Sequence, residues 1–256
     1  MKLSACIEVL FNEAGDDFAD RVRAAAAAGL PAVEFWNWRD KDLAGIAAAA
    51  QDRTIQIAGF CVEPWGQLTD PASHNVFLAG LRETCAQAQW LGVNQLITQV
   101  GQTVAGVERA VQRDAVVAAL KAAGPIVEDA GVTLLIEPLN DKVDHPGYFL
   151  TDTAEAVTIL RRTGSPAVAL IYDRYHAMAM GEPIGHGLEG NTDLIRHVHI
   201  ADAPGRHEPG SGRADWPAEL AWFKANHYDG FFGLEYWPTV ETAKSLEHFA
   251  SLTALA

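Results

Sequence analysis

The chain has 256 residues, of which 49% are hydrophobic and 20% charged, a composition that excludes a disordered or fibrous protein. Its 19 Lys and Arg against 33 Asp and Glu give a net charge of −14, which repels nucleic-acid phosphates and anionic lipid surfaces. No apolar run predicts a signal peptide or a membrane span. The three cysteines, Cys6, Cys61 and Cys85, lack CxxC spacing, which argues against a disulfide framework and predicts a reducing, cytoplasmic location.

Short apolar runs alternate about eight times with amphipathic or alanine-rich stretches of helical length, a pattern typical of strand-helix units around a parallel sheet. The expected strands are Lys2–Ile7, Ala32–Trp36, Ile55–Phe60, Gln95–Thr98, Val132–Glu137, Ala167–Tyr172, Ile195–His199 and Gly230–Glu235. The expected helices are Phe18–Ala28, Asp42–Gln51, Pro71–Leu91, Val107–Glu128, Thr153–Arg162, a short one near Thr192, Pro217–Asn226 and Thr239–Leu252.

Gly124-Pro125 lies inside the fourth expected helix and predicts a kink or break there, because proline removes a backbone donor. No linker rich in Pro, Ser or Gly divides the chain. We therefore predict a single domain over residues 1–256 with the α/β architecture of a closed (β/α)8 TIM barrel, and an open sheet as the alternative.

Four of the expected strands end in, or are directly followed by, side chains that commonly bind metals. These are Glu137, Asp173, His199 and Glu235. In a (β/α)8 barrel the carboxyl ends of the strands meet at one face, so we expect the four side chains to converge. Three neighbouring carboxylates would repel one another unless a cation lay among them. The mixed oxygen and nitrogen set predicts Mg²⁺, Mn²⁺ or Co²⁺ rather than a thiolate-bound metal.

Each of the four residues also has a structural interpretation. Glu137 precedes a proline and can be a loop residue, Asp173 can cap a short helix beginning at Arg174, and His199 can be a hydrogen-bonded core histidine. The recurrence at four strand ends favours the metal site.

Two further residues are candidates for contact with a substrate. His176 lies three residues after Asp173, on the same side of a helical turn. Arg206 lies with Glu208 in a glycine- and proline-rich loop and suits a carboxylate or hydroxyl group, although an exposed Arg–Glu pair is the alternative. Four tryptophans near strand ends can wall a pocket or simply pack: Trp36, Trp38, Trp65 and Trp237.

Several local motifs resemble those of the hydroxypyruvate isomerase family, one branch of the xylose isomerase-like barrels that also include ketose 3-epimerases and an apurinic endonuclease. The motifs are Ile136–Asn140, Pro146–Thr151, Tyr172–His176, His199–Asp202, Arg206–Gly212 and Leu234–Tyr236. The likeness covers most of the chain and is most specific from Val132 to Pro238. It implies that Glu137, Asp173, His199 and Glu235 bind a divalent metal ion and that His176 and Arg206 contact the substrate.

Two positions separate the branches of this group. The hydroxypyruvate isomerases commonly have Gln where His199 stands, whereas the 3-epimerases use the set Glu, Asp, His, Glu. The 3-epimerases usually carry a further substrate-binding Glu shortly after the first ligand, and here that neighbourhood is Lys142-Val143-Asp144-His145. The local motifs favour the isomerase branch.

The resemblance implies an isomerase of carbohydrate metabolism that interconverts a small hydroxy-aldehyde or ketose-type substrate through an enediolate, with Glu137 and Glu235 transferring the proton. A ketose 3-epimerase, similar to D-tagatose or L-ribulose 3-epimerases, and a non-catalytic sugar-binding barrel are the alternatives. We expect a small sugar or hydroxy-oxoacid as partner, no nucleic acid and no membrane, and the sequence leaves a homo-oligomer open.

Overall fold

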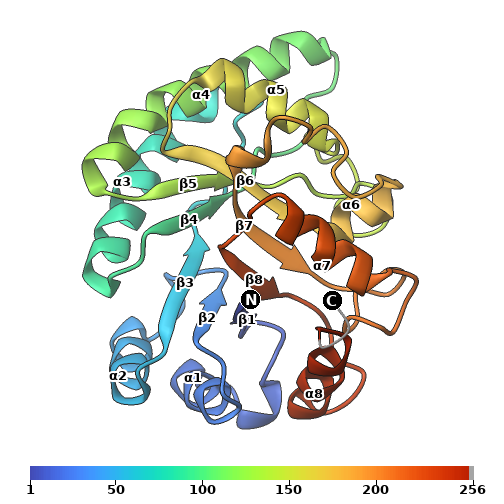
Figure 1. The fold of residues 1–256 in the computed structure, drawn as a ribbon. Helices are drawn as coiled ribbons and strands as arrows, with labels where there is room; N and C mark the ends of the chain where they lie inside the picture. The colour runs from blue at the N-terminus through green and yellow to red at the C-terminus, as the bar shows by residue number, and fades with distance from the viewer. Residues whose placement is uncertain (254–256) are drawn as a thin grey trace.

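Eight parallel strands pair in chain order and close into a barrel in the computed structural model, which describes residues 1–253 (Figure 1). The strands are β1 Lys2–Cys6, β2 Ala32–Phe35, β3 Gln56–Cys61, β4 Gln95–Thr98, β5 Thr133–Ile136, β6 Val168–Asp173, β7 Ile195–Ile200 and β8 Phe231–Leu234. Closure comes from the pairing of β1 with β8, where Ala5 lies opposite Leu234. The (β/α)8 barrel is confirmed, with every strand end within about one residue of its predicted position.

The helices form a ring outside the strands (Figure 1). They are α1 Phe18–Ala27, α2 Leu43–Arg53, α3 His74–Leu91, α4 Arg109–Ala130, α5 Thr153–Thr163, α6 Arg174–Met180, α7 Trp216–Ala225 and α8 Thr242–Thr253. Short 3₁₀ turns cover Asn12–Ala14, Pro71–Ser73 and Thr192–Leu194, so the third predicted helix begins with such a turn. No helix among residues 1–253 is long and apolar enough to cross a membrane.

Aspartates begin five of these helices. The side chains of Asp17, Asp42, Asp152, Asp173 and Asp215 each accept a hydrogen bond from a backbone N–H in the first turn. Such a cap satisfies a donor that has no partner within the helix. The short helix α6 therefore follows β6 directly, because Asp173 both ends the strand and caps the helix.

Helix α4 does not break at its proline: of the predicted kink or break, the break is wrong, and the kink stays a prediction. The helix runs without interruption from Arg109 to Ala130. Pro125 and Lys121, whose carbonyl loses its helical donor, are both exposed, so water can bond to that carbonyl at little cost. The opposite face of the helix, including Leu120 and Val127, is buried against the barrel and holds the helix together.

The inside of the barrel has two chemically different halves. On the side of β3 to β6 it is filled by an aliphatic cluster of Ile97, Leu135, Ala169 and Ile171, with Cys61 packed against it. On the side of β1, β2, β7 and β8 it is filled by buried polar groups, which are Ser4, Glu34, His197 and His199. Most of the remaining core lies between the strands and the surrounding helices.

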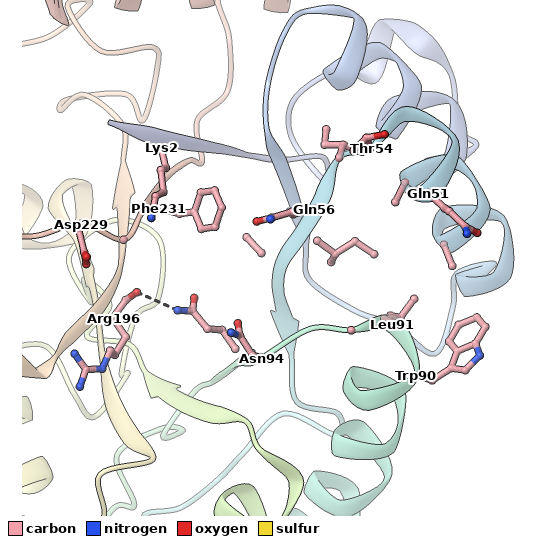
Figure 2. A pocket seen from close by; sticks show the side chains of 18 residues that line it. Lys2, Gln51, Thr54, Gln56, Trp90, Leu91, Asn94, Arg196, Asp229 and Phe231 are labelled. Atoms are coloured by element: carbon pink, nitrogen blue, oxygen red, sulfur yellow. Dashed lines mark hydrogen bonds between the residues drawn. The ribbon is translucent and has the colours of Figure 1, made fainter.

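A wide cavity of about 910 Å³ opens at the amino ends of the strands, between α2 and α3 (Figure 2). Its lining includes Lys2, Gln56, Arg196 and Asp229, which are exposed, and the half-exposed indole of Trp90. In (β/α)8 barrels the reactive groups lie at the opposite face, so this cavity is separate from the site described next.

Candidate active site

The four predicted strand-end residues converge at the carboxyl end of the barrel. Glu137 follows β5, Asp173 ends β6, His199 lies in β7 and Glu235 follows β8. One ligand atom from each lies within 4.8 Å of the others, and all four side chains are buried. The convergence expected from the sequence is therefore present in the structure.

His199 lies at the centre of this cluster. Its Nδ1 is 3.2 Å from Glu137 Oε1, 3.4 Å from Glu235 Oε2 and 3.9 Å from Asp173 Oδ2. Burial would lower the pKa of His199, but Glu235 and the other carboxylates around the ring raise it well above its usual range. The position facing Nδ1 is therefore one of strongly negative potential.

Burial raises the pKa of Glu137 to about 7, against the opposing effect of the nearby imidazole of His199. The backbone carbonyl of Glu137 accepts a hydrogen bond from the Tyr148 hydroxyl at 3.0 Å, which fixes the strand end. A carboxyl group with a pKa near neutrality can both take up and release a proton at physiological pH.

Glu235 has different surroundings. The Trp36 indole N–H donates to its Oε1 at 2.6 Å, and the Arg206 guanidinium donates to its Oε2. Burial alone would raise the pKa of Glu235, but His199, Arg206 and the indole together hold it well below its usual range. Glu235 is thus kept ionised, in contrast to Glu137.

Asp173 serves two structural purposes at once. Its Oδ1 accepts the backbone N–H of His176 at 3.1 Å and caps α6, while Oδ2 faces the cluster. Burial raises the pKa of Asp173, and Arg206 and His199 offset part of this rise. The capping interpretation from the sequence is confirmed, and it coexists with a place in the cluster.

The His176 ring is buried beside the cluster with a defined tautomer. Its Nδ1 accepts the backbone N–H of Asn140 at 3.1 Å, so the proton resides on Nε2. Burial, followed by the charge of Arg206, lowers the pKa of His176 well below its usual value. Nε2 lies 3.6 Å from Asp173 Oδ2 and has no hydrogen-bond partner within the described chain. A buried donor of this kind is suited to a ligand.

Arg206 reaches the cluster from the loop after β7. Its Nη2 contacts Glu235 and lies 3.9 Å from Asp173 Oδ2, and its guanidinium stacks 5.1 Å from the centre of the Tyr175 ring. The alternative of an exposed Arg–Glu pair is wrong, because Glu208 instead accepts bonds from Thr239. Arg206 keeps N–H groups that face away from Glu235, since a guanidinium has five donors.

The loop that carries Arg206 is braced by one buried carboxylate. Asp202 accepts the backbone N–H groups of Gly210 at 2.8 Å, Arg213 at 2.9 Å and Ala214 at 3.2 Å, and also the Trp216 indole N–H at 3.0 Å. These bonds hold together a segment that lacks regular secondary structure.

A cavity of about 120 Å³ opens onto the cluster. Of the cluster, Glu137, His199 and Glu235 line it, and the rest of its wall includes Trp36, Trp65, Leu139, His145 and Gln99. Of the four tryptophans considered from the sequence, Trp36 and Trp65 line this cavity, and the Trp38 indole points instead to Thr84 at 3.1 Å. Trp237 lines a wider hollow outside, beyond Arg206.

Sequence reasoning did not single out two buried residues behind the cluster, Glu34 and His197. Glu34 Oε1 lies 2.8 Å from His199 Nε2, and Oε2 lies 2.9 Å from His197 Nε2. A signal was available, because Glu34 interrupts an otherwise apolar strand. Two-residue spacing also places His197 and His199 on one face of β7.

The donor set fits a hard divalent ion. Three carboxylate groups and one imidazole nitrogen, all buried and with ligand atoms within 4.8 Å of one another, match the oxygen-rich sites of Mg²⁺ and Mn²⁺, with Co²⁺ also accommodated. Glu137, Asp173, His199 and Glu235 are the residues that can hold such an ion. The fold and this cluster together define a (β/α)8 barrel built for chemistry on a small molecule at its carboxyl-end face.

The comparisons with known proteins identify the family. A family model described as xylose isomerase-like TIM barrel matches residues 22–252, and the chain belongs to that family. The chain is 28% identical to the hydroxypyruvate isomerase of Escherichia coli, over 96% of this chain and 97% of the relative. It is 29% identical to the 2-oxo-tetronate isomerase of Cupriavidus necator, over 96% of both. The resemblance inferred from the motifs is confirmed, and the protein is an isomerase.

Solved structures give the same fold. A protein from Brucella melitensis, described as an AP endonuclease of family 2, superposes with a TM-score of 0.90 at 29% identity over 98% of both chains. A D-psicose 3-epimerase from Clostridium cellulolyticum H10 superposes with a TM-score of 0.82 over 98% of this chain and 99% of its own. The second is only 16% identical, so it shows the fold alone.

Proposed function

We propose that this isomerase interconverts a small hydroxy-carbonyl compound in the manner of hydroxypyruvate isomerase, by moving a proton between adjacent carbons. The observation that carries the proposal is the convergence of Glu137, Asp173, His199 and Glu235. Three of them, Glu137, His199 and Glu235, line a small cavity. Glu137 and Glu235 are the two groups that transfer the proton.

The same four residues would hold Mg²⁺, Mn²⁺ or Co²⁺ as resident cofactor. When bound, such an ion supplies a Lewis acid that stabilises negative charge on the substrate oxygens. Glu137 and Glu235 reach the cluster from β5 and β8, so carboxylates from different parts of the barrel meet at one substrate. One takes the proton from the hydroxyl-bearing carbon and leaves an enediolate, and the other delivers a proton to the adjacent carbon. The hydroxyl proton passes from one substrate oxygen to the other, so that the carbonyl and the hydroxyl exchange positions.

Other residues of the chain bind and orient the substrate. The Nε2–H of His176 has no hydrogen-bond partner among residues 1–253 and is positioned to donate to a substrate oxygen. Arg206 offers its remaining N–H groups to a carboxylate, for which a planar guanidinium is well suited. The Trp36 indole fixes Glu235 in place through its 2.6 Å hydrogen bond.

The size of the cavity supports a short substrate. At about 120 Å³ the cavity is small for a ligand pocket, which favours a small substrate. The names of the Escherichia coli and Cupriavidus necator relatives refer to short oxo acids, and both carry a carboxylate for Arg206. We therefore favour a short hydroxy-oxoacid.

A ketose 3-epimerase is the second candidate, because the observed set Glu, Asp, His, Glu is the one that the sequence resemblance links to that branch. The same two carboxylates would then exchange a proton on a single carbon. A reaction run in D₂O distinguishes the two candidates. Isomerisation places deuterium on the carbon next to the one that lost its proton, whereas epimerisation places it on the same carbon.

The test is an assay of the purified protein with hydroxypyruvate, 2-oxo-tetronates and small ketoses and aldoses, each with Mg²⁺, Mn²⁺ or Co²⁺. Isomerisation of a three- or four-carbon hydroxy-oxoacid is the expected result. Epimerisation of ketoses alone would favour the second candidate, and inactivity on every compound would favour a non-catalytic sugar-binding barrel.

A cytoplasmic location stays a prediction, which cell fractionation can check. The three cysteines are free thiols in the structure.

A further inference from the structure

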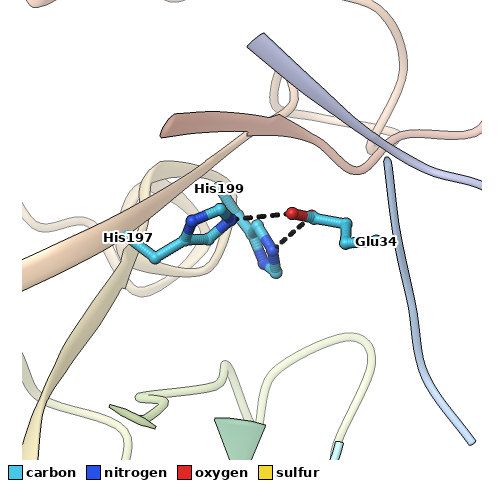
Figure 3. Close-up of side chains that lie close together, drawn as sticks. All are labelled: Glu34, His197 and His199. Atoms are coloured by element: carbon cyan, nitrogen blue, oxygen red, sulfur yellow. Dashed lines mark ion pairs between the residues drawn. The ribbon is translucent and has the colours of Figure 1, made fainter. Parts of the chain in front are cut away.

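A buried carboxylate lies behind the proposed metal site, on the far side of the His199 ring. Glu34 is 3% exposed and has no Lys or Arg partner within residues 1–253. Its neighbours are the rings of His197 and His199, toward which the carboxylate points, as Figure 3 shows. The Ser4 hydroxyl also donates to Glu34 Oε2 at 2.8 Å.

The barrel is shaped around this carboxylate. The pairing of β2 with β3 shifts between Val33 and Glu34, and the pairing of β6 with β7 shifts just before the residue opposite His197. Such irregularities redirect side chains. In β8 a Cβ atom at Gly233 would lie 2.5 Å from Glu34 Oε1 and 2.8 Å from His197 Nε2, so only glycine leaves room for the group. Burying a carboxylate that has no Lys or Arg partner is costly, so the strand shifts and Gly233 indicate that Glu34 serves the site rather than the fold alone.

The two nitrogens of His199 face different partners. Nδ1 faces the three carboxylates of the cluster and shares a hydrogen bond of 3.2 Å with Glu137 Oε1, a contact that a bound ion would replace. Nε2 faces Glu34 Oε1 at 2.8 Å. The N–H direction at Nε2 is not aligned with the carboxylate, so the contact has hydrogen-bond length without hydrogen-bond geometry. No other acceptor serves Nε2 among the described residues. Contacts of this kind often align only when the ligand is bound.

We propose that Glu34 is a positioning residue for the metal ligand His199: it holds the imidazole proton on Nε2 and turns the ring, so that the lone pair of Nδ1 faces the carboxylate cluster. A metal ion binds the unprotonated nitrogen of a neutral imidazole, and a carboxylate on the other nitrogen fixes that tautomer and increases the basicity of the ligand. This role rests on the metal centre of the proposed function.

His197 supports the same arrangement from the side. Its ring packs edge-on against that of His199, with centroids 5.0 Å apart and planes at 87°. Its Nε2 lies 2.9 Å from the second oxygen of Glu34. His197 thus restrains the His199 ring and the carboxylate together, so that the remaining freedom of His199 is small.

The test compares Mn²⁺ binding by calorimetry in the wild-type protein and in Glu34→Gln. We expect one ion per chain in both, with a dissociation constant raised roughly 10- to 100-fold in the variant. Ser4→Ala, which leaves Oε1 in place, should give a smaller increase. Glu155→Gln is the matched control, because it removes a largely buried carboxylate that pairs with Arg109 and does not line the site cavity. It should leave the dissociation constant unchanged.

A second measurement determines the tautomer of His199 directly. It uses the wild-type protein, so it does not require that any variant folds. Long-range ¹H–¹⁵N correlation spectra of the Mg²⁺-loaded wild-type protein should show the His199 proton on Nε2. A proton on Nδ1, or a Glu34→Gln dissociation constant within twofold of wild type, would overturn the positioning role while leaving the metal centre intact. Failure of the wild-type protein to bind any of the three ions would instead overturn the metal centre, and the positioning role with it.

Discussion

In both halves of the barrel interior alternate residues of each strand point inward, but these side chains are aliphatic in one half and polar or charged in the other. Toward β4, β5 and β6 the inward positions carry Ile97, Leu135 and Ile171, which fill space and exclude water. Toward β2 and β7 the inward positions carry Glu34, His197 and His199, which are costly to bury and whose charged or polar groups contact one another. The aliphatic half stabilises the fold, and the polar half supports the site.

This difference predicts separate responses to mutation. A change in the aliphatic half should reduce the free energy of unfolding and spare ion binding, because it removes buried apolar area. A change in the polar half should alter ion binding or turnover more than stability, since functional sites commonly carry groups that the fold alone would not select.

The largest effect is expected at the cluster itself. Glu137→Gln and Glu235→Gln should each lower kcat by roughly 10²–10⁴-fold, the usual contribution of a general acid or base, with unchanged circular dichroism. Steady-state kinetics on the best substrate of the screen provide the measurement. Near-full turnover in either variant would remove that residue from the proton transfer.

A matching change in the aliphatic half should act on stability alone. Leu135 is fully buried, so Leu135→Ala should reduce the free energy of unfolding by about 2–5 kcal/mol. Urea denaturation measures this loss, and Mn²⁺ titration of the folded variant should give the wild-type affinity. A weakened affinity would show that the two halves are coupled.

Removal of the ion should affect both activity and stability. Exhaustive dialysis against a chelator should abolish turnover, and Mn²⁺ at 100 times its dissociation constant should then add about 2.7 kcal/mol of stability. For a chain of this size the unfolding temperature should rise by roughly 5–10 °C. Activity that survived chelation would contradict the role of the ion.

A methyl group can be introduced into the polar half at β8. In Gly233→Ala the new Cβ would lie 2.5 Å from Glu34 Oε1 and 2.6 Å from His199 Cδ2. We expect a loss of about 1–3 kcal/mol from overpacking, together with weaker Mn²⁺ binding. Calorimetry measures the loss of Mn²⁺ affinity, and thermal unfolding of the same sample measures the loss of stability. Unchanged Mn²⁺ binding would mean that the site tolerates a displaced His199 ring.

The smallest effect is expected at the wide cavity on the amino-end face. Trp90 is 57% exposed there, so Trp90→Ala should change stability by no more than about 0.5 kcal/mol and leave kcat/KM unchanged. A marked loss of activity in this variant would mean that the larger cavity takes part in function.

The architecture was predictable because strand and helix signals are local. Apolar runs such as Gln95–Thr98 and the glycine after α3 fix element boundaries without knowledge of the rest of the chain. The four strand-end residues could be grouped because a barrel brings all carboxyl ends to one face. The short helix α6 and the intact α4 depended on details of capping and exposure that a pattern does not contain.

The support behind the cluster could not be predicted with the same ease. Glu34 and His197 are far apart in sequence and meet only because the closed barrel brings β2 and β7 across its interior from each other. Their contact depends on the two irregularities in strand register, and register across a barrel is not encoded in any one segment. The Trp36 bond to Glu235 likewise joins opposite ends of the chain.

The bracing of the 202–216 segment by Asp202 has a consequence for the rate of catalysis. Arg206 adopts a left-handed backbone conformation, with φ of 55°, and so many bonds converge on Asp202 that the segment has little scope to swing open and shut. If Arg206 binds the substrate as proposed, we expect its guanidinium to be in place beforehand, without a lid movement of this segment. We therefore expect that raising the solvent viscosity does not lower kcat through a slower movement of the Arg206 segment.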